Sequence, residues 1–176
     1  MKKKKCKICK SEYQPFNSLT KVCSPSCAID LVKQDKDKKF KKQTREMKER
    51  IKSRSDWLKD VQTVFNQYIR IRDKLEPCIS CQRHHEGQYH AGHYRSVGSA
   101  PELRFNELNN NKQCAPCNNH LSGNLTPYRV NLIKKIGIDM VELIEGPHEP
   151  KKYTISELKE LKKLYKMKIK EITKND

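Results

Sequence analysis

The sequence predicts an α+β protein made of two small cysteine-containing modules that are connected and followed by helices. Two observations support this fold class. All eight cysteines fall into four closely spaced pairs, which divide into an N-terminal set and a central set. Only 35% of the 176 residues are hydrophobic, which is too little for one large apolar core. We therefore expect small modules that bound metal stabilises.

The cysteine spacing predicts two structural zinc ions. The first set is Cys6-x2-Cys9 with Cys23-x3-Cys27, and the second set is Cys78-x2-Cys81 with Cys114-x2-Cys117. Two such turns direct four thiolates at one point, which is the tetrahedral coordination of structural zinc. A disulfide framework is typical of small secreted domains, but the lysine-rich start of the chain lacks the apolar core of a secretion signal. We therefore predict zinc binding and a cytoplasmic location.

The charge of the chain indicates nucleic acid as its partner. There are 38 Lys and Arg against 21 Asp and Glu, a formal charge of +17, and two four-thiolate zinc sites would lower this by only four. A phosphate backbone is the natural counterpart of such a surface. A merely soluble basic surface and an anionic membrane are the alternatives. No apolar run approaches the roughly 18 residues of a membrane span, so we predict no membrane association.

The first module is expected over residues 1–32. Ser24 is suited to cap a helix that begins at Pro25, because proline in the first turn loses no hydrogen bond. Residues 33–54 contain 11 Lys and Arg against 4 Asp and Glu, with no Gly or Pro. This segment is predicted to be a solvated helix or a disordered basic arm, with phosphate contacts that do not depend on base sequence.

Residues 55–76 predict an amphipathic helix capped by Ser55 or Asp56. Its apolar residues recur at helical spacing and predict a core-facing stripe: Trp57, Val61, Val64, Phe65, Tyr68 and Ile69. The second module is expected over residues 77–125. Residues 126–176 predict further helices, one beginning at Thr126-Pro127, a short one over 139–145, and a last one behind a capping box of Thr154 and Glu157.

The segment between Cys81 and Gly123 is rich in side chains that bind metal through nitrogen or oxygen. It contains His90, His93, Asn106, Asn109 to Asn111, Asn118 and His120. A purely structural zinc module needs none of them, so they indicate a second, harder metal ion. His84 and His85 precede Glu86-Gly87 and are more typical of a solvated turn.

Several stretches of this segment resemble known nucleases. The CxxC turn, Gly92-His93-Tyr94-Arg95-Ser96, and Asn109 followed by Cys114-x2-Cys117-Asn118 resemble an HNH (ββα-metal) nuclease braced by a four-cysteine zinc, as in phage endonuclease VII. The chain also resembles the phage NinG (Rap) recombination family over about residues 1–146. That similarity lies in Phe65-Asn66-x-Tyr68-Ile69-Arg70-x-Arg72-Asp73, Cys78-Ile79-Ser80-Cys81, residues 92–96 and Leu121-Ser122-Gly123-Asn124.

The resemblance implies a structure-selective DNA endonuclease that acts on Holliday junctions and D-loops, in the host cytoplasm if the chain is phage-encoded. It implies that His93 is the general base, that Asn109 braces it through the loop backbone, and that Asn118 binds catalytic Mg²⁺ or Mn²⁺. Gly92 departs from the pattern, which has a metal-binding Asp or His there. His90 and His120 are the candidates to replace that ligand.

Other functional expectations concern partners and alternatives. Four basic residues are expected to bind branched or duplex DNA: Arg95, Arg104, Lys112 and Arg129. For Arg95 a solvated strand arginine is the alternative. A homodimer would suit the two equivalent strands of a four-way junction, although no apolar seam specifies one. Two rival functions are a non-catalytic zinc-dependent DNA- or RNA-binding protein and an HNH nuclease with a packaging or homing role.

Overall fold

The structure is a computed structural model that describes residues 2–174. It confirms the α+β class, with helices and two small two-stranded sheets. The chain divides into two compact units, Met1–Lys52 and Ser53–Asp176, and each is described by itself. Within residues 2–174 no helix has the length and apolar character needed to cross a bilayer.

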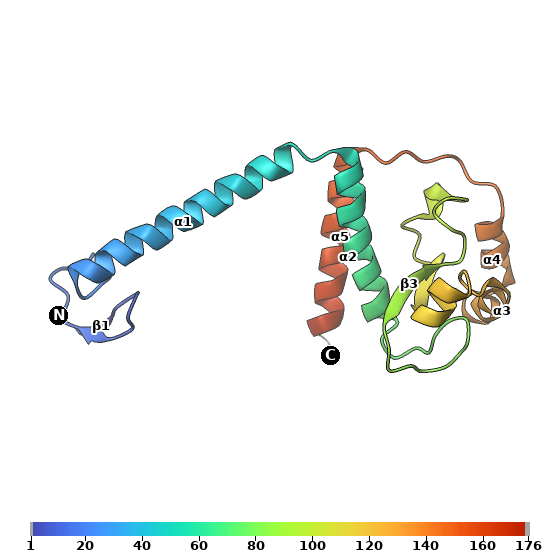
Figure 1. The fold of residues 1–176 in the computed structure, drawn as a ribbon, viewed down its shortest axis with the longest axis horizontal. Helices are drawn as coiled ribbons and strands as arrows, with labels where there is room; N and C mark the ends of the chain where they lie inside the picture. Colours follow the sequence, from blue (N-terminus) through green and yellow to red (C-terminus); the bar gives the residue numbers. More distant parts are fainter. Residues whose placement is uncertain (1, 175–176) are drawn as a thin grey trace. The chain divides into compact units, whose positions relative to one another are not determined.

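The first unit is a short hairpin followed by one long helix (Figure 1). Strands β1 (Lys4–Lys5) and β2 (Glu12–Tyr13) pair antiparallel, and α1 spans Pro25–Arg50. The predicted cap is confirmed, because the Ser24 hydroxyl accepts from the Cys27 N–H at 3.3 Å and Pro25 lies in the first turn. The basic segment after residue 32 was predicted to be either a helix or a disordered arm. It is helical, and it continues the helix that Ser24 caps as far as Arg50.

The second unit begins with α2 (Arg54–Arg72), which Ser53 caps. The Ser53 hydroxyl accepts from the Asp56 N–H at 3.2 Å, and the Asp56 carboxylate accepts from the Ser53 N–H at 3.1 Å. The predicted cap at Ser55 or Asp56 is therefore wrong by two or three residues, since Asp56 is the reciprocal member of a capping box. The box predicted at Thr154 and Glu157 is confirmed ahead of α5 (Ile155–Lys174).

The main hydrophobic core lies where α2 packs along α5 (Figure 1). Five members of the predicted stripe are buried there, and Val64 packs at the edge; the buried ones are Trp57, Val61, Phe65, Tyr68 and Ile69. The rings of Phe65 and Tyr165 pack edge to face with centroids 4.8 Å apart. Full burial of a side chain such as Phe65 stabilises the fold by about 1.5–3 kcal/mol, so this seam holds the two helices together.

A β-hairpin and four short helical segments complete the unit. Their bounds are β3 (Tyr89–His93), η1 (Pro101–Leu103), β4 (Asn110–Cys114), the π-helical turn η2 (Pro116–His120), α3 (Leu125–Ile136) and α4 (Ile138–Glu145). The strands are antiparallel, with His93 opposite Asn110 and Tyr89 opposite Cys114. Helix α3 begins one residue before the predicted Thr126-Pro127 start, after Asn124 in the left-handed conformation.

Strand β4 is buried although it is largely polar. The Asn110 Nδ2 donates to the Asn106 carbonyl at 2.8 Å, and the Asn111 Nδ2 donates to the Tyr128 hydroxyl at 3.2 Å. Buried polar groups are tolerated when they are hydrogen-bonded, and such networks favour one arrangement of the chain. Side-chain hydrogen bonds therefore tie β4 to parts of the unit that are distant in sequence, such as Tyr128.

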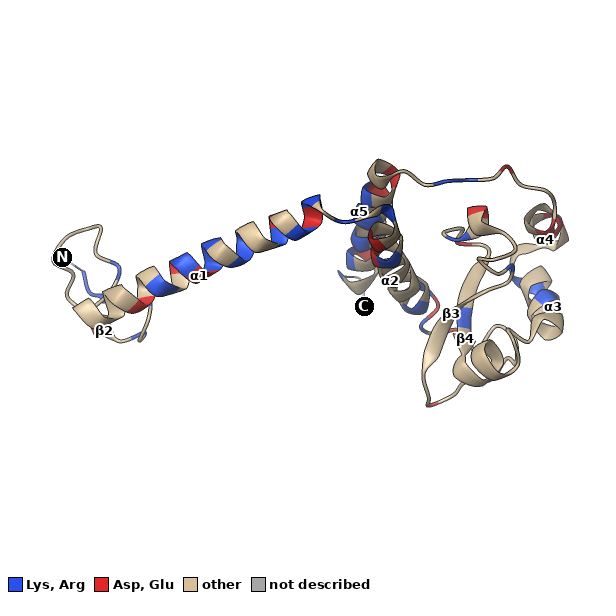
Figure 2. Ribbon diagram, turned by 45° about the horizontal axis from the view of Figure 1, so that its top comes forward, with Lys and Arg blue, Asp and Glu red and all other residues tan. Residues whose placement is uncertain are grey.

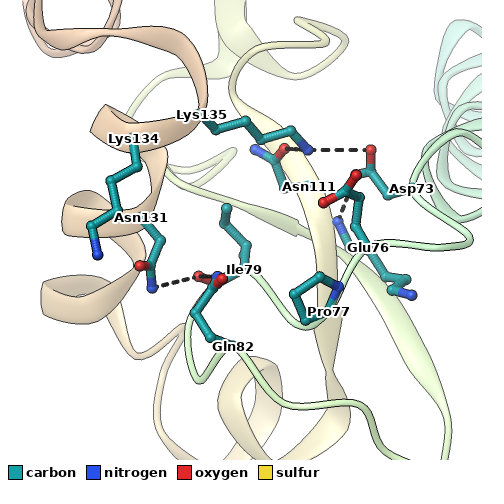
Figure 3. A pocket seen from close by; sticks show the side chains of 10 residues that line it. Asp73, Glu76, Pro77, Ile79, Gln82, Asn111, Asn131, Lys134 and Lys135 are labelled. Atoms are coloured by element: carbon teal, nitrogen blue, oxygen red, sulfur yellow. Dashed lines mark hydrogen bonds and ion pairs between the residues drawn. The ribbon is translucent and has the colours of Figure 1, made fainter.

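A small pocket of about 210 Å³ marks the place where α2, β4 and α3 meet (Figure 3). Asp73, at the end of α2, accepts from the Lys112 N–H at 3.0 Å and from the Lys135 Nζ at 3.3 Å. Lys135 also donates to the Asn111 Oδ1 at 2.8 Å. Burial alone would raise the pKa of Asp73, but hydrogen bonds and charge from Arg72, followed by Lys135, lower it overall. We assign this pocket a structural role.

Candidate functional site

The predicted cysteine sets come together in two clusters. In each cluster the four Sγ atoms lie within 4.8 Å of one another, and none forms a disulfide: Cys6, Cys9, Cys23 and Cys27 in the first, Cys78, Cys81, Cys114 and Cys117 in the second. The Sγ atoms of Cys9 and Cys23 are 3.5 Å apart, and those of Cys81 and Cys114 are 3.9 Å apart. A zinc tetrahedron with bonds of about 2.3 Å has edges of about 3.8 Å. Both clusters are therefore compatible with structural zinc.

Several N–H groups surround the sulfurs of the second cluster. The Cys114 N–H donates to the Cys78 Sγ at 3.3 Å, and the Asn124 Nδ2 donates to the Cys117 Sγ at 3.5 Å. The His85 Nε2 lies 3.2 Å from the Cys81 Sγ. Such contacts orient ligands and stabilise thiolate charge. The solvated-turn interpretation is thus wrong for His85, which supports the cluster.

His93 lies at the end of β3, half-buried, with its Nε2 3.1 Å from the Arg104 carbonyl oxygen. A carbonyl only accepts, so Nε2 carries the hydrogen and Nδ1 keeps a free lone pair when the ring is neutral. Burial lowers the pKa of His93 below its ordinary value of 6.5; the carbonyl hydrogen bond opposes this shift and the charge of Arg104 adds to it. The neutral form is therefore favoured.

Asn109 holds the loop that follows His93. Its side chain is fully buried, with Oδ1 accepting from the Arg95 N–H at 2.8 Å and Nδ2 donating to the Arg95 carbonyl at 3.0 Å. A third hydrogen bond reaches the Leu103 carbonyl at 3.3 Å. Because these bonds fix both backbone groups two residues beyond His93, Asn109 restricts the position of the imidazole.

His93 lines an open cleft of about 420 Å³. The other lining residues are Tyr94, Arg95, Ser96, Ser99, Ser122, Leu125 and Glu145. Hydrogen bonds from Arg129, then from Tyr94, lower the pKa of Glu145 to about 2. The cleft thus combines one neutral imidazole, three serine hydroxyls and one carboxylate that Arg129 and Tyr94 hold in place.

The residues predicted to bind the catalytic metal lie apart from this lining. Asn118 is half-buried in η2, and its Nδ2 donates to the Asn119 Oδ1 at 2.7 Å. His120, at the end of the same turn, is exposed. Among residues 2–174, those that line the cleft include His93 but not Asn118, His90 or His120. The predicted base and the predicted brace therefore lie at the same end of the β3–β4 hairpin, and the predicted metal ligands are not among the residues that line the cleft.

The space beside Gly92 is filled by Gln113. A Cβ at position 92 would lie 2.9 Å from the Gln113 Cβ and closer still to its Oε1, so no side chain fits there. Within the described part of the chain, the buried Gln113 Oε1 and the buried His90 Nε2 have no hydrogen-bond partner, and these two residues are directly opposite in the β3–β4 register. The sequence analysis did not single out Gln113. Because side chains alternate along a strand, Gln113 lies on the same face of β4 as Asn111, the residue opposite Gly92.

The residues expected to contact DNA have varied surroundings. Lys112 is only 6% exposed, and its Nζ donates to the Lys74 carbonyl at 2.9 Å, so the expectation that it contacts DNA is wrong. Arg95 donates to three carbonyls at the end of α4, and Arg129 donates to Glu145 at 2.7 and 2.9 Å. Arg104 is partly buried. For these three arginines, contact with DNA stays a prediction.

The positive charge is concentrated in the first unit. Residues 1–52 contain 17 Lys and Arg against 6 Asp and Glu, whereas residues 53–176 contain 21 against 15. Figure 2 shows Lys and Arg along α1, where all residues over 32–50 except Thr44 are exposed. The strongest electrostatic attraction for a polyanion therefore belongs to this unit.

These features define an α+β protein with two four-cysteine clusters compatible with structural zinc. The chain belongs to the NinG family, since the family described as "Bacteriophage Lambda NinG protein" matches residues 1–175. It is 39% identical to "Protein ninG" of Escherichia phage 933W over 188 residues, covering 97% of this chain and 94% of that protein. It is also 39% identical to "Protein ninG" of Escherichia phage lambda (97% and 93% covered) and 38% identical to that of Salmonella phage P22 (97% and 94% covered). No solved structure matches the chain.

Proposed function

We propose that this protein is an HNH-type endodeoxyribonuclease that nicks or resolves branched DNA such as Holliday junctions and D-loops. The observation that carries the proposal is the placement of His93 and Asn109 at the same end of the β3–β4 hairpin, where Asn109 holds the backbone of Arg95 two residues beyond His93. A neutral imidazole stands at the end of the first strand, and a buried amide fixes the loop behind it. The resemblance to HNH nucleases assigns these two positions to the base and its brace.

The proposed reaction is hydrolysis of a phosphodiester. The free Nδ1 of His93 takes a proton from water, the hydroxide forms a bond to phosphorus, and the bond to the 3′ oxygen breaks as that oxygen takes a proton from solvent. The products are a 5′-phosphate and a 3′-hydroxyl. The lowered pKa of His93 supports this role, because the ring is already neutral at the pH of a cell.

A divalent Mg²⁺ or Mn²⁺ would supply charge stabilisation to the phosphorane oxygens and the departing 3′ oxygen. In this proposal Asn118 holds it, with His90 or His120 as a nitrogen ligand and Gln113 Oε1 as an oxygen donor. The unpartnered buried atoms of His90 and Gln113 are donor types that such metals accept, but both residues lie on the strand face opposite to His93. A zinc held by four thiolates has no open position for substrate.

The first unit is proposed to hold the DNA backbone. The exposed basic side chains of α1 suit phosphate contacts that do not depend on sequence. The protein would act in the cytoplasm of the host, and a homodimer would supply one cleft for each of the two equivalent strands of a four-way junction. A packaging or homing nuclease would use the same chemistry on plain duplex.

Two observations favour a second candidate, a non-catalytic zinc-dependent DNA- or RNA-binding protein. Gln113 blocks the position at which HNH enzymes keep a metal-binding side chain, and Asn118 is absent from the lining of the His93 cleft. This candidate keeps the zinc clusters and the basic helix but has no hydrolytic step.

The discriminating experiment incubates the zinc-loaded protein with an end-labelled four-way junction, a linear duplex of the same sequence, and Mg²⁺ or Mn²⁺. Metal-dependent cuts near the branch support the proposal. Equal rates on junction and linear duplex favour the packaging or homing nuclease. Binding without cleavage under every metal condition favours the non-catalytic protein.

A further inference from the structure

The loop over residues 14–20 of the first unit presents two apolar side chains to solvent. Phe16 is 92% exposed, the highest value among the exposed large hydrophobic residues of the described chain, and Leu19 is 81% exposed. Pro15, between them and β2, is buried. Large apolar side chains exposed to water lower solubility, so two of them on one short loop indicate a contact surface.

This loop is held in one shape by hydrogen bonds. The Asn17 Oδ1 accepts from the Leu19 N–H at 3.0 Å, the Thr20 N–H at 3.0 Å and the Thr20 hydroxyl at 2.9 Å. The Tyr13 hydroxyl donates to the Thr20 carbonyl at 2.7 Å. A braced loop loses little entropy when it binds, so the two apolar side chains are presented ready for contact.

The surroundings of the loop are strongly basic. Residues 2–21 contain seven lysines and one acidic residue, and the Lys4 Nζ donates to the Ser18 carbonyl of the loop at 2.6 Å. An apolar protein patch would be poorly matched to such charge. The ligand that offers both flat apolar faces and negative charge is a nucleic acid whose bases are unstacked.

We infer that the loop over residues 14–20 is a wedge for branched DNA, with Phe16 stacking on a base exposed at the branch point and Leu19 filling the space beside it. Apolar side chains that enter base steps hold duplexes in bent or opened forms, and neighbouring lysines neutralise the flanking phosphates. The inference rests on the proposed function only for its choice of branched DNA as ligand. It adds a source of preference for branches that the sequence-independent contacts of α1 do not supply.

The test is binding in the absence of Mg²⁺ and Mn²⁺, so that no strand is cut. Zinc-loaded wild type, Phe16→Ala, Leu19→Ala and Phe16→Trp are titrated against a four-way junction with 2-aminopurine at the branch, and against a linear duplex of the same sequence. Phe40→Ala is the matched control, because Phe40 is also exposed (70%) but lies on α1. Zinc content and circular dichroism establish that each variant is folded.

Phe16→Ala should weaken junction binding by about tenfold, leave duplex binding unchanged, and remove the change in 2-aminopurine fluorescence. Phe16→Trp should retain both signals, Leu19→Ala should lose part of them, and Phe40→Ala should behave as wild type. Unchanged junction binding by Phe16→Ala overturns the inference and leaves a protein partner as the occupant. Equal weakening on junction and duplex, or the same loss in Phe40→Ala, overturns it too.

The binding result is separate from the proposed catalysis. A protein that shows the Phe16 effect but cuts no DNA contradicts the nuclease proposal and leaves the wedge in place. A protein that cuts junctions while Phe16→Ala binds them normally contradicts the wedge alone.

Discussion

Gln113 occupies the space beside the Cα of Gly92 that a side chain at position 92 would need. Its Nε2 donates to the Ser80 hydroxyl at 2.7 Å and to the Gly123 carbonyl, so one side chain links β4 to the Cys78–Cys81 turn and to the loop that follows η2. The glycine is therefore explained by packing. It is the partner of a glutamine that connects the zinc module to the hairpin.

Gly92→Ala should lower the free energy of unfolding by about 1–3 kcal/mol, because the added methyl group overlaps Gln113. Thermal or urea unfolding followed by the fluorescence of Trp57 measures this change. In the background of Gln113→Gly the same substitution should cost much less, since that change also removes the Gln113 Cβ that would lie 2.9 Å away. Additive losses in the double variant would show that the two side-chain positions do not compete.

Asp73→Asn should lower the free energy of unfolding by about 2–4 kcal/mol, because the 3%-exposed carboxylate is the shared partner of Arg72, the Lys112 N–H and Lys135. Its folded pKa lies below the unfolded value of about 3.9, so its contribution is complete above about pH 4 and disappears as the pH falls through the folded pKa.

The measurement is stability against pH between 3 and 7. Wild type should lose stability more steeply below pH 4 than Asp73→Asn does. The exposed Asp139 supplies the control, and Asp139→Asn should retain the wild-type slope. Equal acid slopes for wild type and Asp73→Asn would contradict the assigned role of this carboxylate.

Each cysteine cluster should hold one zinc that stabilises its own unit. Cys9→Ser should remove one of two zinc ions and leave the unfolding transition of Trp57 unchanged, because Trp57 lies in the second unit. Cys114→Ser should remove the other ion and destabilise that transition, as zinc binding contributes folding energy directly. Elemental analysis together with Trp57 fluorescence checks both. Fewer than two zinc ions in wild type would refute the assignment.

The exposed lysines of α1 should set the salt dependence of DNA binding. Replacing Lys38, Lys39, Lys41 and Lys42 by Gln should make the slope of log K against log salt shallower by about 0.9 for each phosphate that is no longer neutralised. The control replaces four exposed lysines of α5, which are Lys163, Lys166, Lys170 and Lys174. If both sets reduce the slope equally, total charge rather than α1 determines binding.

Helical spacing and cysteine spacing predicted much of this fold. The stripe from Trp57 to Ile69 lies in the α2–α5 core, and each set of four cysteines forms one cluster, because both patterns depend on local geometry. The buried polar strand β4 was beyond such reasoning. Its side chains are tolerated only through partners distant in sequence, such as Lys74 for Lys112 and Tyr128 for Asn111. The same long-range interactions bury Lys112, which was expected to bind DNA. They also place Gln113 beside Gly92, which sequence spacing did not predict.

We propose that His93 is the base of a metal-dependent DNA hydrolysis. Its direct test is the single-turnover cleavage rate of a four-way junction by wild type and His93→Ala, each zinc-loaded and at saturating protein. We expect a decrease of about 10²–10⁴-fold with zinc content and junction affinity unchanged, and a wild-type rate that declines in acid with a midpoint below pH 6.5, as the lowered pKa of His93 requires. Cleavage by His93→Ala at the wild-type rate would contradict the claim.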